Sequence, residues 1–215
     1  RTAIFMSQTG GQCRASNYVS LIRKALKDLG MEQVPVVSVN PSGIEKNPGF
    51  KFTYALIRRA LMGMIIGDMF MKVLYATRPY ELVEGSANEL YDRLAKKSER
   101  VVASGHFGNY KKLLKEIAHE FDILPLKDIK KPKVGVVGEI LVKYHPTANN
   151  EIVRIIEEEG GEAVVLDLID FFMYGCYSKG YFNHKELSGS KKSAFANRLA
   201  IKAMEVFRKP YRDAL

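Results

Sequence analysis

The sequence predicts an α/β protein with a Rossmann-like parallel sheet, helices on both faces of that sheet and a mainly helical insertion. Two strand–loop–helix–strand patterns lead to this prediction, one within 1–45 and one within 132–168. Apolar residues follow one another in their strands, as in parallel strands that are covered on both faces. The residues between the two patterns, 50–125, have helical spacing, and 169–215 predicts further helices at the C-terminal end.

The first pattern starts with the apolar run "TAIFMS", which predicts a strand, and continues through the glycine-rich turn "QTGGQCRAS". Helical spacing over 17–29 predicts a helix, and Gly30 is the residue type expected just after a helix C-terminus. A second apolar run over 34–39 predicts the parallel partner of the first strand. The stretches "NPSG" and "KNPG" that follow are typical chain breaks.

The insertion contains the most apolar window of the chain, 54–76. A membrane-spanning helix needs about 20 predominantly apolar residues. Arg58, Arg59, Asp68 and Lys72 interrupt this window, and charged side chains inside a membrane are costly. We therefore predict a buried or half-buried helix of a soluble domain, and no membrane partner.

The rest of the insertion also predicts helices. In "SANELYDRLAKKS", Ser86 is a candidate N-cap, with Glu89 three residues later as in a capping box. The stretch "YKKLLKEIAHEFD" has helical spacing, whereas "RVVASG" fits either a short strand or part of a helix. Because apolar residues do not alternate in this segment, we expect a mainly helical insertion or lid.

The second pattern repeats the first. The run "KVGVVGEI" predicts a strand, "LVKYHPTANN" a loop, 151–159 a helix ended by two glycines, and "EAVVLDL" another strand. Crossover connections between parallel strands are right-handed, and consecutive strands usually lie next to each other. We therefore expect the four strands to form one sheet.

Composition limits the function classes. The 215 residues carry a formal net charge of +9, which suits nucleic acid, an anionic surface or phosphorylated small molecules. No RRM, KH or zinc-finger signature is present, so we expect no nucleic-acid partner. The two cysteines, Cys13 and Cys176, make no disulfide framework, which favours the cytoplasm. Because the chain runs from Arg1 straight into a strand, we expect a piece of a longer polypeptide.

Two loops, 7–16 and 138–150, leave the carboxyl ends of predicted strands, where parallel α/β sheets bind their ligands. If these strands are neighbours, the loops face one cleft, with backbones within about 15 Å of each other. Cys13 precedes a predicted helix. The free N–H groups at the start of that helix and the positive charge of Arg14 both favour the thiolate form of Cys13. Such a thiolate is a nucleophile or a soft metal ligand. The alternative is an unreactive small residue beside a turn.

Gly10 and Gly11 lie in the same loop as Cys13. They fit an anion-binding nest or a tight turn, and they lack the G-x-G-x-x-G spacing of a dinucleotide site. In the second loop, Glu139 and His145 form a candidate acid/base pair. Alternatively, Glu139 orders the loop and His145 is a solvated neighbour of a proline.

Three further polar residues of the second loop are candidates for binding a cofactor, namely Lys143, Asn149 and Asn150. The asparagines are also candidate N-caps of the helix that follows. Cys176 lies among aromatic residues in "FFMYGCYS", and we expect it in the core. The group of methionines over 62–71 is expected to pack in the core or to form a subunit interface.

These segments together resemble a known family. "GGQCRASNY" resembles the Gly-Pro-Cys-Arg-Phe-Gly-Gln-Tyr motif of activase-related proteins in the 2-hydroxyacyl-CoA dehydratase superfamily. "RPYELVEGSANELYDRL" and "KPKVGVVGEILVKYHPTANNEIVRIIEEEGGEAVV" resemble later blocks of the same family, in the same order. The chain departs from the motif at Gln12, in place of proline, and at 15–17, in place of Phe-Gly-Gln.

The resemblance implies low-potential radical chemistry under anaerobic conditions. In that superfamily an ATP-hydrolysing activator with an iron–sulfur cluster passes an electron to a dehydratase, which removes water from a 2-hydroxyacyl-CoA. Cys13 then matches a cluster ligand placed after a strand and before a helix. A four-iron cluster takes about three or four thiolates, so the remaining ligands are expected elsewhere in the parent protein. No Walker-type loop for ATP is present.

The sequence therefore predicts a component of an iron–sulfur 2-hydroxyacyl-CoA dehydratase/activase system, acting on an acyl-CoA or supporting its reduction. The expected partners are an ATP-dependent activator protein, or a fused activator domain, and an acyl-CoA substrate. The expected cofactor is an iron–sulfur cluster of the full-length parent. Two alternatives stay open: a non-catalytic regulatory or docking module, and a domain that binds a phosphorylated ligand through its basic surface.

Overall fold

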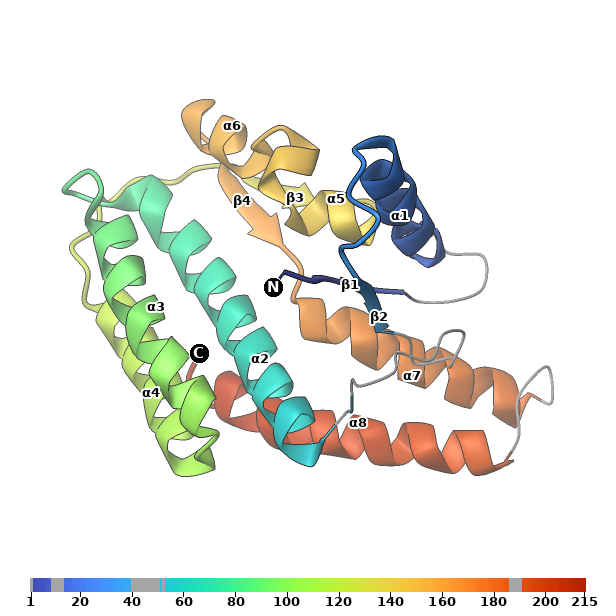
Figure 1. Ribbon diagram of the computed structural model, residues 1–215. Coiled ribbons are helices and arrows are strands. Elements are labelled where there is room, and N and C mark those ends of the chain that lie inside the picture. The colour runs from blue at the N-terminus through green and yellow to red at the C-terminus, as the bar shows by residue number, and fades with distance from the viewer. Residues whose placement is uncertain (1, 9–13, 40–50, 52, 186–190) are drawn as a thin grey trace. The chain divides into compact units, whose positions relative to one another are not determined.

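The structure is a computed structural model that describes residues 2–8, 14–39, 51, 53–185 and 191–215. By its internal contacts the chain divides into two compact units. Unit 1 comprises 1–52 and 139–144, and unit 2 comprises 53–138 and 145–215. Helices make up most of the described chain, and its strand pairs are short and parallel (Figure 1).

Unit 1 is built on one pair of parallel strands. β1 (Ile4–Ser7) pairs with β2 (Val36–Val39), with Ile4 opposite Val36 and Ser7 opposite Val39. The helix α1 (Tyr18–Asp28) lies between them in the chain, after the 3₁₀ turn η1 (Arg14–Ser16). The predicted strand, helix and strand of this segment are therefore confirmed.

Gly30 ends α1 as its position in the sequence predicts. Its φ of +67° lies in the left-handed region that glycine adopts without strain, and its N–H donates to the carbonyl of Lys27. The N–H of Met31 donates to the carbonyl of Leu26 at 2.8 Å, which pairs another carbonyl of the last turn. The helix end therefore leaves few backbone groups unpaired. A short helix, α5 (Ile140–Tyr144), also belongs to unit 1.

Unit 2 is a helical body organised around α2 (Tyr54–Thr77). This helix packs against α3 (Ser86–Ser104), α4 (Phe107–Asp122), α7 (Leu168–His184) and α8 (Lys191–Arg212) (Figure 1). The core between these helices consists of fully buried aliphatic, methionine and aromatic side chains, including Met62, Ile65, Met69, Tyr110, Leu113, Leu114, Ile117, Ile169 and Tyr211. The methionines Met62 and Met69 are thus packing residues.

A second pair of parallel strands belongs to unit 2. β3 (Lys133–Val136) pairs with β4 (Glu162–Val165), and α6 (Ile152–Glu158) lies between them in the chain after the 3₁₀ turn η3 (Pro146–Asn149). β4 and α6 pack against each other, and β4 also packs against α2. This is the second strand–loop–helix–strand pattern of the sequence.

The expectation of one four-stranded sheet is wrong for the described residues. They form two sheets of two strands, β1–β2 and β3–β4, although the parallel pairing within each is confirmed. Val134 and Val164 are each 39% exposed, so the β3–β4 pair is not covered on both faces. The part of the chain that the structure describes has no clear Rossmann-like sheet with helices on both faces. Each strand has only four residues. Apolar runs predict that strands close together in the chain pair with each other, but they do not predict pairing between strands that are far apart in the chain.

α2 is the apolar window that the sequence predicts as a buried or half-buried helix. The segment 54–80 is long and apolar enough to cross a membrane by length and composition, and half of its apolar window is buried inside the structure. A core helix of a soluble protein passes the same test. Its buried side chains include Met62, Ile65 and Met69, which pack against the neighbouring helices.

The start of α3 differs from the prediction. Ser86 is the first residue of the helix, and Gly85, with φ +88°, precedes it as the cap residue. The capping group is the buried carboxylate of Glu81, which accepts hydrogen bonds from the N–H groups of Gly85 and Ala87 at 2.8 Å each. Glu89 is therefore not the capping carboxylate. The ambiguous stretch "RVVASG" is helical and carries α3 to Ser104.

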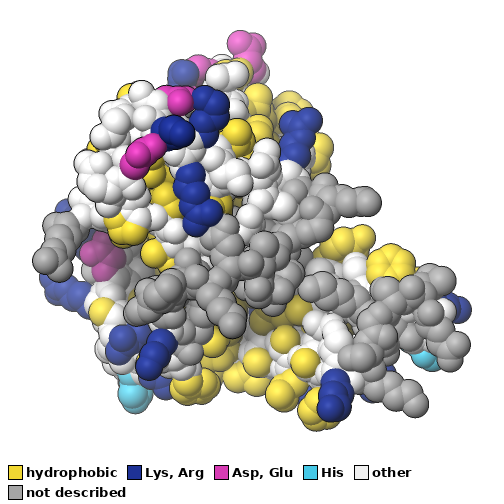
Figure 2. Space-filling view, turned by 45° about the vertical axis from the view of Figure 1, so that its right-hand side comes forward, with side chains coloured by type: hydrophobic (Ala, Val, Ile, Leu, Met, Phe, Trp, Pro, Cys, Tyr) yellow, Lys and Arg dark blue, Asp and Glu magenta, His cyan; other side chains and the backbone are white. Residues whose placement is uncertain are grey.

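α7 is apolar on its outer as well as its inner side. Ile169 and Met173 are buried in the core of unit 2, whereas Tyr174, Tyr177 and Tyr181 are 71%, 55% and 59% exposed. In the space-filling view, hydrophobic side chains gather in the lower half of the molecule, where α7 and α8 lie (Figure 2). A helix that is apolar all round is usually buried, so this aromatic surface is a candidate for contact with another molecule.

Candidate functional site

One side chain joins the residues that precede and follow the segment that holds Cys13. Gln8, at the carboxyl end of β1, donates from its amide nitrogen to the carbonyl of Ser16 at 2.6 Å. Its amide oxygen accepts a hydrogen bond from the hydroxyl of Ser38, on β2, at 2.8 Å. Gln8 and Ser38 are 6% and 1% exposed, so both bonds are shielded from water. The carboxyl ends of β1 and β2 and the start of the α1 region are therefore held together.

Residues 9–13, here called the Cys13 segment, lie outside the described residues, and with them the predicted site residues Gly10, Gly11 and Cys13. The residues on both sides are described. Arg14 opens η1 directly after Cys13, and α1 begins at Tyr18. The segment thus leads from the carboxyl end of a parallel strand to the start of a helix, as the sequence predicts.

Glu139 is an ordered, ionised carboxylate of unit 1. Its Oε2 accepts hydrogen bonds from the N–H groups of Leu141 and Val142, at 2.9 and 3.1 Å, and so caps the start of α5. Partial burial raises the pKa of this carboxyl, but a hydrogen bond with Tyr18, those two N–H groups and the charge of Arg14 outweigh burial and lower the pKa below its ordinary value. Arg14, Tyr18 and Glu139 therefore come together in unit 1.

The other candidates of the second loop make local contacts. His145 accepts a hydrogen bond at its Nδ1 from the N–H of Ala148, at 3.3 Å, and caps η3. The amide oxygen of Asn149 accepts from the N–H of Ile152 at the start of α6, as its alternative role as a helix cap predicts. The ammonium of Lys143 lies 4.4 Å from the ring centroid of Tyr144.

Asn150 adopts a left-handed conformation, with φ +56°, between η3 and α6. It is therefore a turn residue at this point of the chain. Glu139 belongs to unit 1 and His145 to unit 2, and each side chain caps its own helix. The acid/base pair of these two residues stays a prediction.

A metal site needs several ligand side chains close together. They contain no group of three or more His, Cys, Asp or Glu side chains that could hold a metal ion. The whole sequence has two cysteines. Cys176 packs against the core of unit 2, as predicted, and Cys13 lies outside the described residues. Since a four-iron cluster takes about three or four thiolates, this chain alone does not supply its ligands.

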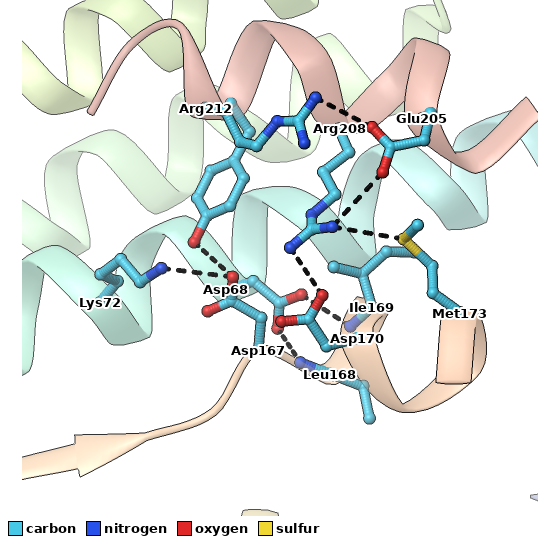
Figure 3. A network of polar contacts seen from close by, with 11 residues as sticks. Asp68, Lys72, Asp167, Leu168, Ile169, Asp170, Met173, Glu205, Arg208 and Arg212 are labelled. Carbon is cyan, nitrogen blue, oxygen red and sulfur yellow. Dashed lines mark hydrogen bonds and ion pairs between the residues drawn. The ribbon is translucent and has the colours of Figure 1, made fainter. Parts of the chain in front are cut away.

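A second polar centre lies inside unit 2 and is here called the Asp68 cluster (Figure 3). It comprises side chains from α2, from the β4–α7 junction and from α8, namely Asp68, Lys72, Asp167, Asp170, Glu205, Arg208, Tyr211 and Arg212. Asp68 is 1% exposed in the middle of α2. Its carboxylate accepts hydrogen bonds from the N–H groups of Leu168 and Ile169, at 2.7 and 2.9 Å. These are the first two residues of α7.

Asp167 is the second buried carboxylate of the Asp68 cluster, and it follows the carboxyl end of β4. Its Oδ2 accepts a hydrogen bond from the hydroxyl of Tyr211 at 2.7 Å and lies 3.3 Å from the ammonium of Lys72. Burial and the hydrogen bond to Asp167 raise the pKa of Tyr211, which therefore stays protonated and remains the donor. The ammonium of Lys72 also lies 5.2 Å from the ring centroid of Tyr211.

Sequence reasoning missed the Asp68 cluster, although two signals pointed to it. Asp68 is a lone carboxylate in the most apolar window of the chain, and a buried charge needs partners. Asp167 directly follows an apolar strand run, the position at which α/β proteins place functional groups. Tyr211 gives no such signal, because its role depends on how α8 packs against α2.

A cavity of about 510 Å³ lies beside the Asp68 cluster in unit 2. Lys72, Thr77, Lys115, His119 and Asp122 are among its lining residues, together with apolar side chains and Asp213. Two lysines face two aspartates, so the charge of the lining favours neither anions nor cations. Its volume lies in the range of small-molecule pockets, about 300–1,000 Å³.

Comparison of this chain with protein-family models, with curated proteins and with solved structures gives no match in any of the three.

Proposed function

We propose that this chain is part of an iron–sulfur system of the 2-hydroxyacyl-CoA dehydratase/activase type. In this proposal Cys13 supplies one thiolate ligand of a four-iron cluster, and cysteines outside this chain supply the others. The system either transfers low-potential electrons to an acyl-CoA or dehydrates it, which is a lyase reaction. Its setting is the anaerobic cytoplasm, and its electron source is an ATP-dependent activator protein or a fused activator domain.

The double hydrogen bond of Gln8 is the observation that carries this proposal. It joins Gln8, which precedes the Cys13 segment, to Ser16, which follows it, at the carboxyl end of the β1–β2 pair, where parallel α/β units place their ligands. A ligand loop that is fixed at both ends has less conformational entropy to lose when a metal binds. The sequence resemblance supplies the cluster chemistry, and this geometry supports the position of the ligand.

The residues that follow Cys13 support a thiolate at this position. The start of α1 and the guanidinium of Arg14 are positive, and positive groups lower the pKa of a nearby thiol. The ionised Glu139 lies close enough to Arg14 for their charges to interact. In the proposal Glu139 is a positioning residue that orients the guanidinium of Arg14 through the attraction between their charges.

A second candidate function is a docking or regulatory module that never contacts the substrate. The exposed aromatic surface of α7, with Tyr174, Tyr177 and Tyr181, favours this alternative. Tyrosines of this kind are enriched at protein interfaces. Such a module needs no cluster ligand, so the two candidates differ in the role of Cys13.

Anaerobic iron and sulfide analysis of the complete polypeptide that carries this chain tests the proposal. Cys13→Ser should lower the bound iron or, where the other ligands retain the cluster, the dehydration activity. Cys176→Ser is the matched control and should change neither, because Cys176 packs against the core of unit 2. Iron and activity that survive Cys13→Ser unchanged would reject Cys13 as a ligand and favour the docking module.

A further inference from the structure

Two arginine side chains of α2 meet at one point of the turn between α3 and α4. Arg58 and Arg59 lie near the start of α2, at the end of unit 2 where α3 stops and α4 begins (Figure 1). A Cβ on Gly105, the residue that ends α3, would lie 2.8 Å from Nη2 of Arg58 and 3.3 Å from Nε of Arg59. Both nitrogens are therefore within reach of one small ligand.

Gly105 provides the space for this arrangement. Its φ of +66° lies in the left-handed region that glycine adopts without strain, and a side chain here would collide with the guanidinium of Arg58. Gly105 is buried, whereas its neighbours Ser104 and His106 are exposed. The two guanidinium groups therefore lie against the backbone at the end of α3.

Neither guanidinium is neutralised. Among the described residues, no Asp or Glu lies within ion-pair distance of Arg58 or Arg59, and neither side chain donates a hydrogen bond. The ring of Tyr54 lies 5.9 Å from the guanidinium carbon of Arg58. Nε of Arg58 is buried without a partner, whereas its two Nη nitrogens stay accessible. Because native proteins pair nearly all buried polar groups, an unpartnered guanidinium points to a missing ligand.

The neighbouring chain adds positive charge to this end of unit 2. No Asp or Glu occurs within 53–67 or within 100–115. Arg100, near the end of α3, and Lys111 and Lys112, near the start of α4, are exposed. The C-terminus of a helix carries roughly half a negative charge, and the N-terminus of the next helix carries roughly half a positive charge. The ends of α3 and α4 therefore leave the two guanidinium charges uncompensated.

We propose that Arg58 and Arg59 bind a phosphoryl group, in the form of a phosphate monoester or a diphosphate. A guanidinium presents a planar fork of N–H donors that matches the oxygens of a phosphate, and such charge-assisted hydrogen bonds are strong. A phosphate monoester carries a charge of nearly −2 at neutral pH, which balances two arginines, whereas a carboxylate balances one. This site lies in unit 2 and does not depend on the role of Cys13.

The geometry favours a compact anion over a nucleic-acid strand. Proteins that bind single strands use a positively charged groove that follows the backbone, together with aromatic side chains on which the bases stack. Here the two guanidinium groups converge on Gly105. One phosphoryl group fits this convergence, and both a soluble phosphorylated molecule and a lipid headgroup can supply it.

Isothermal titration calorimetry of the chain with inorganic pyrophosphate, in chloride buffer at physiological ionic strength, tests the site. Arg58→Gln and Arg59→Gln should each lower the affinity about tenfold, because each removes hydrogen bonds between charged groups. Arg58→Lys keeps the charge but loses the planar fork, so it should also bind more weakly. Arg154→Gln is the matched control, because Arg154 lies on α6, which packs against β4, and this variant should bind like the unmodified chain.

The unmodified chain failing to bind pyrophosphate would overturn the proposal, as would equal affinities of the unmodified chain and both glutamine variants. Full affinity in Arg58→Lys would show that charge alone holds the anion, and would reject the fork. Since Arg59 is exposed, Arg59→Gln decides if the Arg58 variants fail to fold.

Two further titrations identify the source of the phosphoryl group. In sedimentation with phosphatidylcholine vesicles that contain phosphatidic acid, binding that Arg59→Gln loses would assign the site to a lipid headgroup. No vesicle binding, with pyrophosphate binding retained, would assign it to a soluble ligand. A single-stranded oligonucleotide that binds more tightly than pyrophosphate, and equally well to both glutamine variants, would reject the phosphoryl site.

Discussion

Among single residues, Tyr211 has the clearest structural role in unit 2. Its side chain is 1% exposed, and its hydroxyl donates to the buried carboxylate of Asp167 at 2.7 Å. Hydrogen bonds to charged groups contribute about 1.5–3 kcal/mol. The ring fills the core between α8 and α2, so a change confined to the hydroxyl isolates the polar contribution.

Tyr211→Phe should lower the free energy of unfolding by about 2 kcal/mol, because among the described side chains Asp167 then keeps only the partly exposed Lys72 as a partner. Urea unfolding followed by circular dichroism measures this loss. Tyr174→Phe is the control, since Tyr174 is 71% exposed, and it should stay within about 0.5 kcal/mol of the unmodified chain. Equal stability of the two variants would mean that the buried hydroxyl contributes nothing.

At the scale of elements, the start of α3 depends on a carboxylate from outside the helix. Glu81, which is 8% exposed, accepts hydrogen bonds from the N–H groups of Gly85 and Ala87 and lies 3.3 Å from the hydroxyl of Ser86. Glu81→Ala should lower the free energy of unfolding by about 1–2 kcal/mol, the usual range for a lost N-cap. Thermal unfolding followed by circular dichroism measures the change.

Glu84→Ala is the control for that prediction, because Glu84 is an exposed carboxylate three residues further along the same turn. It should have little effect on the midpoint of unfolding. If Glu84→Ala and Glu81→Ala destabilise equally, the cause is the general loss of negative charge near the helix N-terminus. The specific capping role of Glu81 would then be rejected.

The helices and strands that the sequence predicted correctly are those whose formation depends on residues close together in the chain. Consecutive apolar residues gave the strands, helical spacing gave α1 and α4, and Gly30 gave the end of α1. The cap of α3 was missed because Glu81 reaches the helix across a turn, in a conformation that sequence spacing does not reveal. Likewise, Asp68 caps a helix one hundred residues away in the chain.

At the scale of the whole molecule, the sequence predicted the pairing of strands within each pattern but not the number of sheets. Each pair is closed by its own local connection, which makes β1–β2 and β3–β4 predictable. Joining the pairs into one sheet requires contacts between distant parts of the chain, and apolar runs do not specify those. For the candidate site, the strand before the Cys13 segment and the helix after it were predictable, whereas the Gln8–Ser38 hydrogen bond between β1 and β2 was not.

The central claim is that Cys13 is a ligand of an iron–sulfur cluster, and electron paramagnetic resonance of the reduced, complete polypeptide tests it most directly. Replacing a thiolate ligand by an alkoxide changes the electronic structure of the iron that it binds. The account predicts a cluster signal in the unmodified polypeptide, an altered or lost signal in Cys13→Ser, and an unaltered signal in Cys176→Ser. A cluster signal that is identical in the unmodified polypeptide and in Cys13→Ser, or no cluster signal in either, would contradict it.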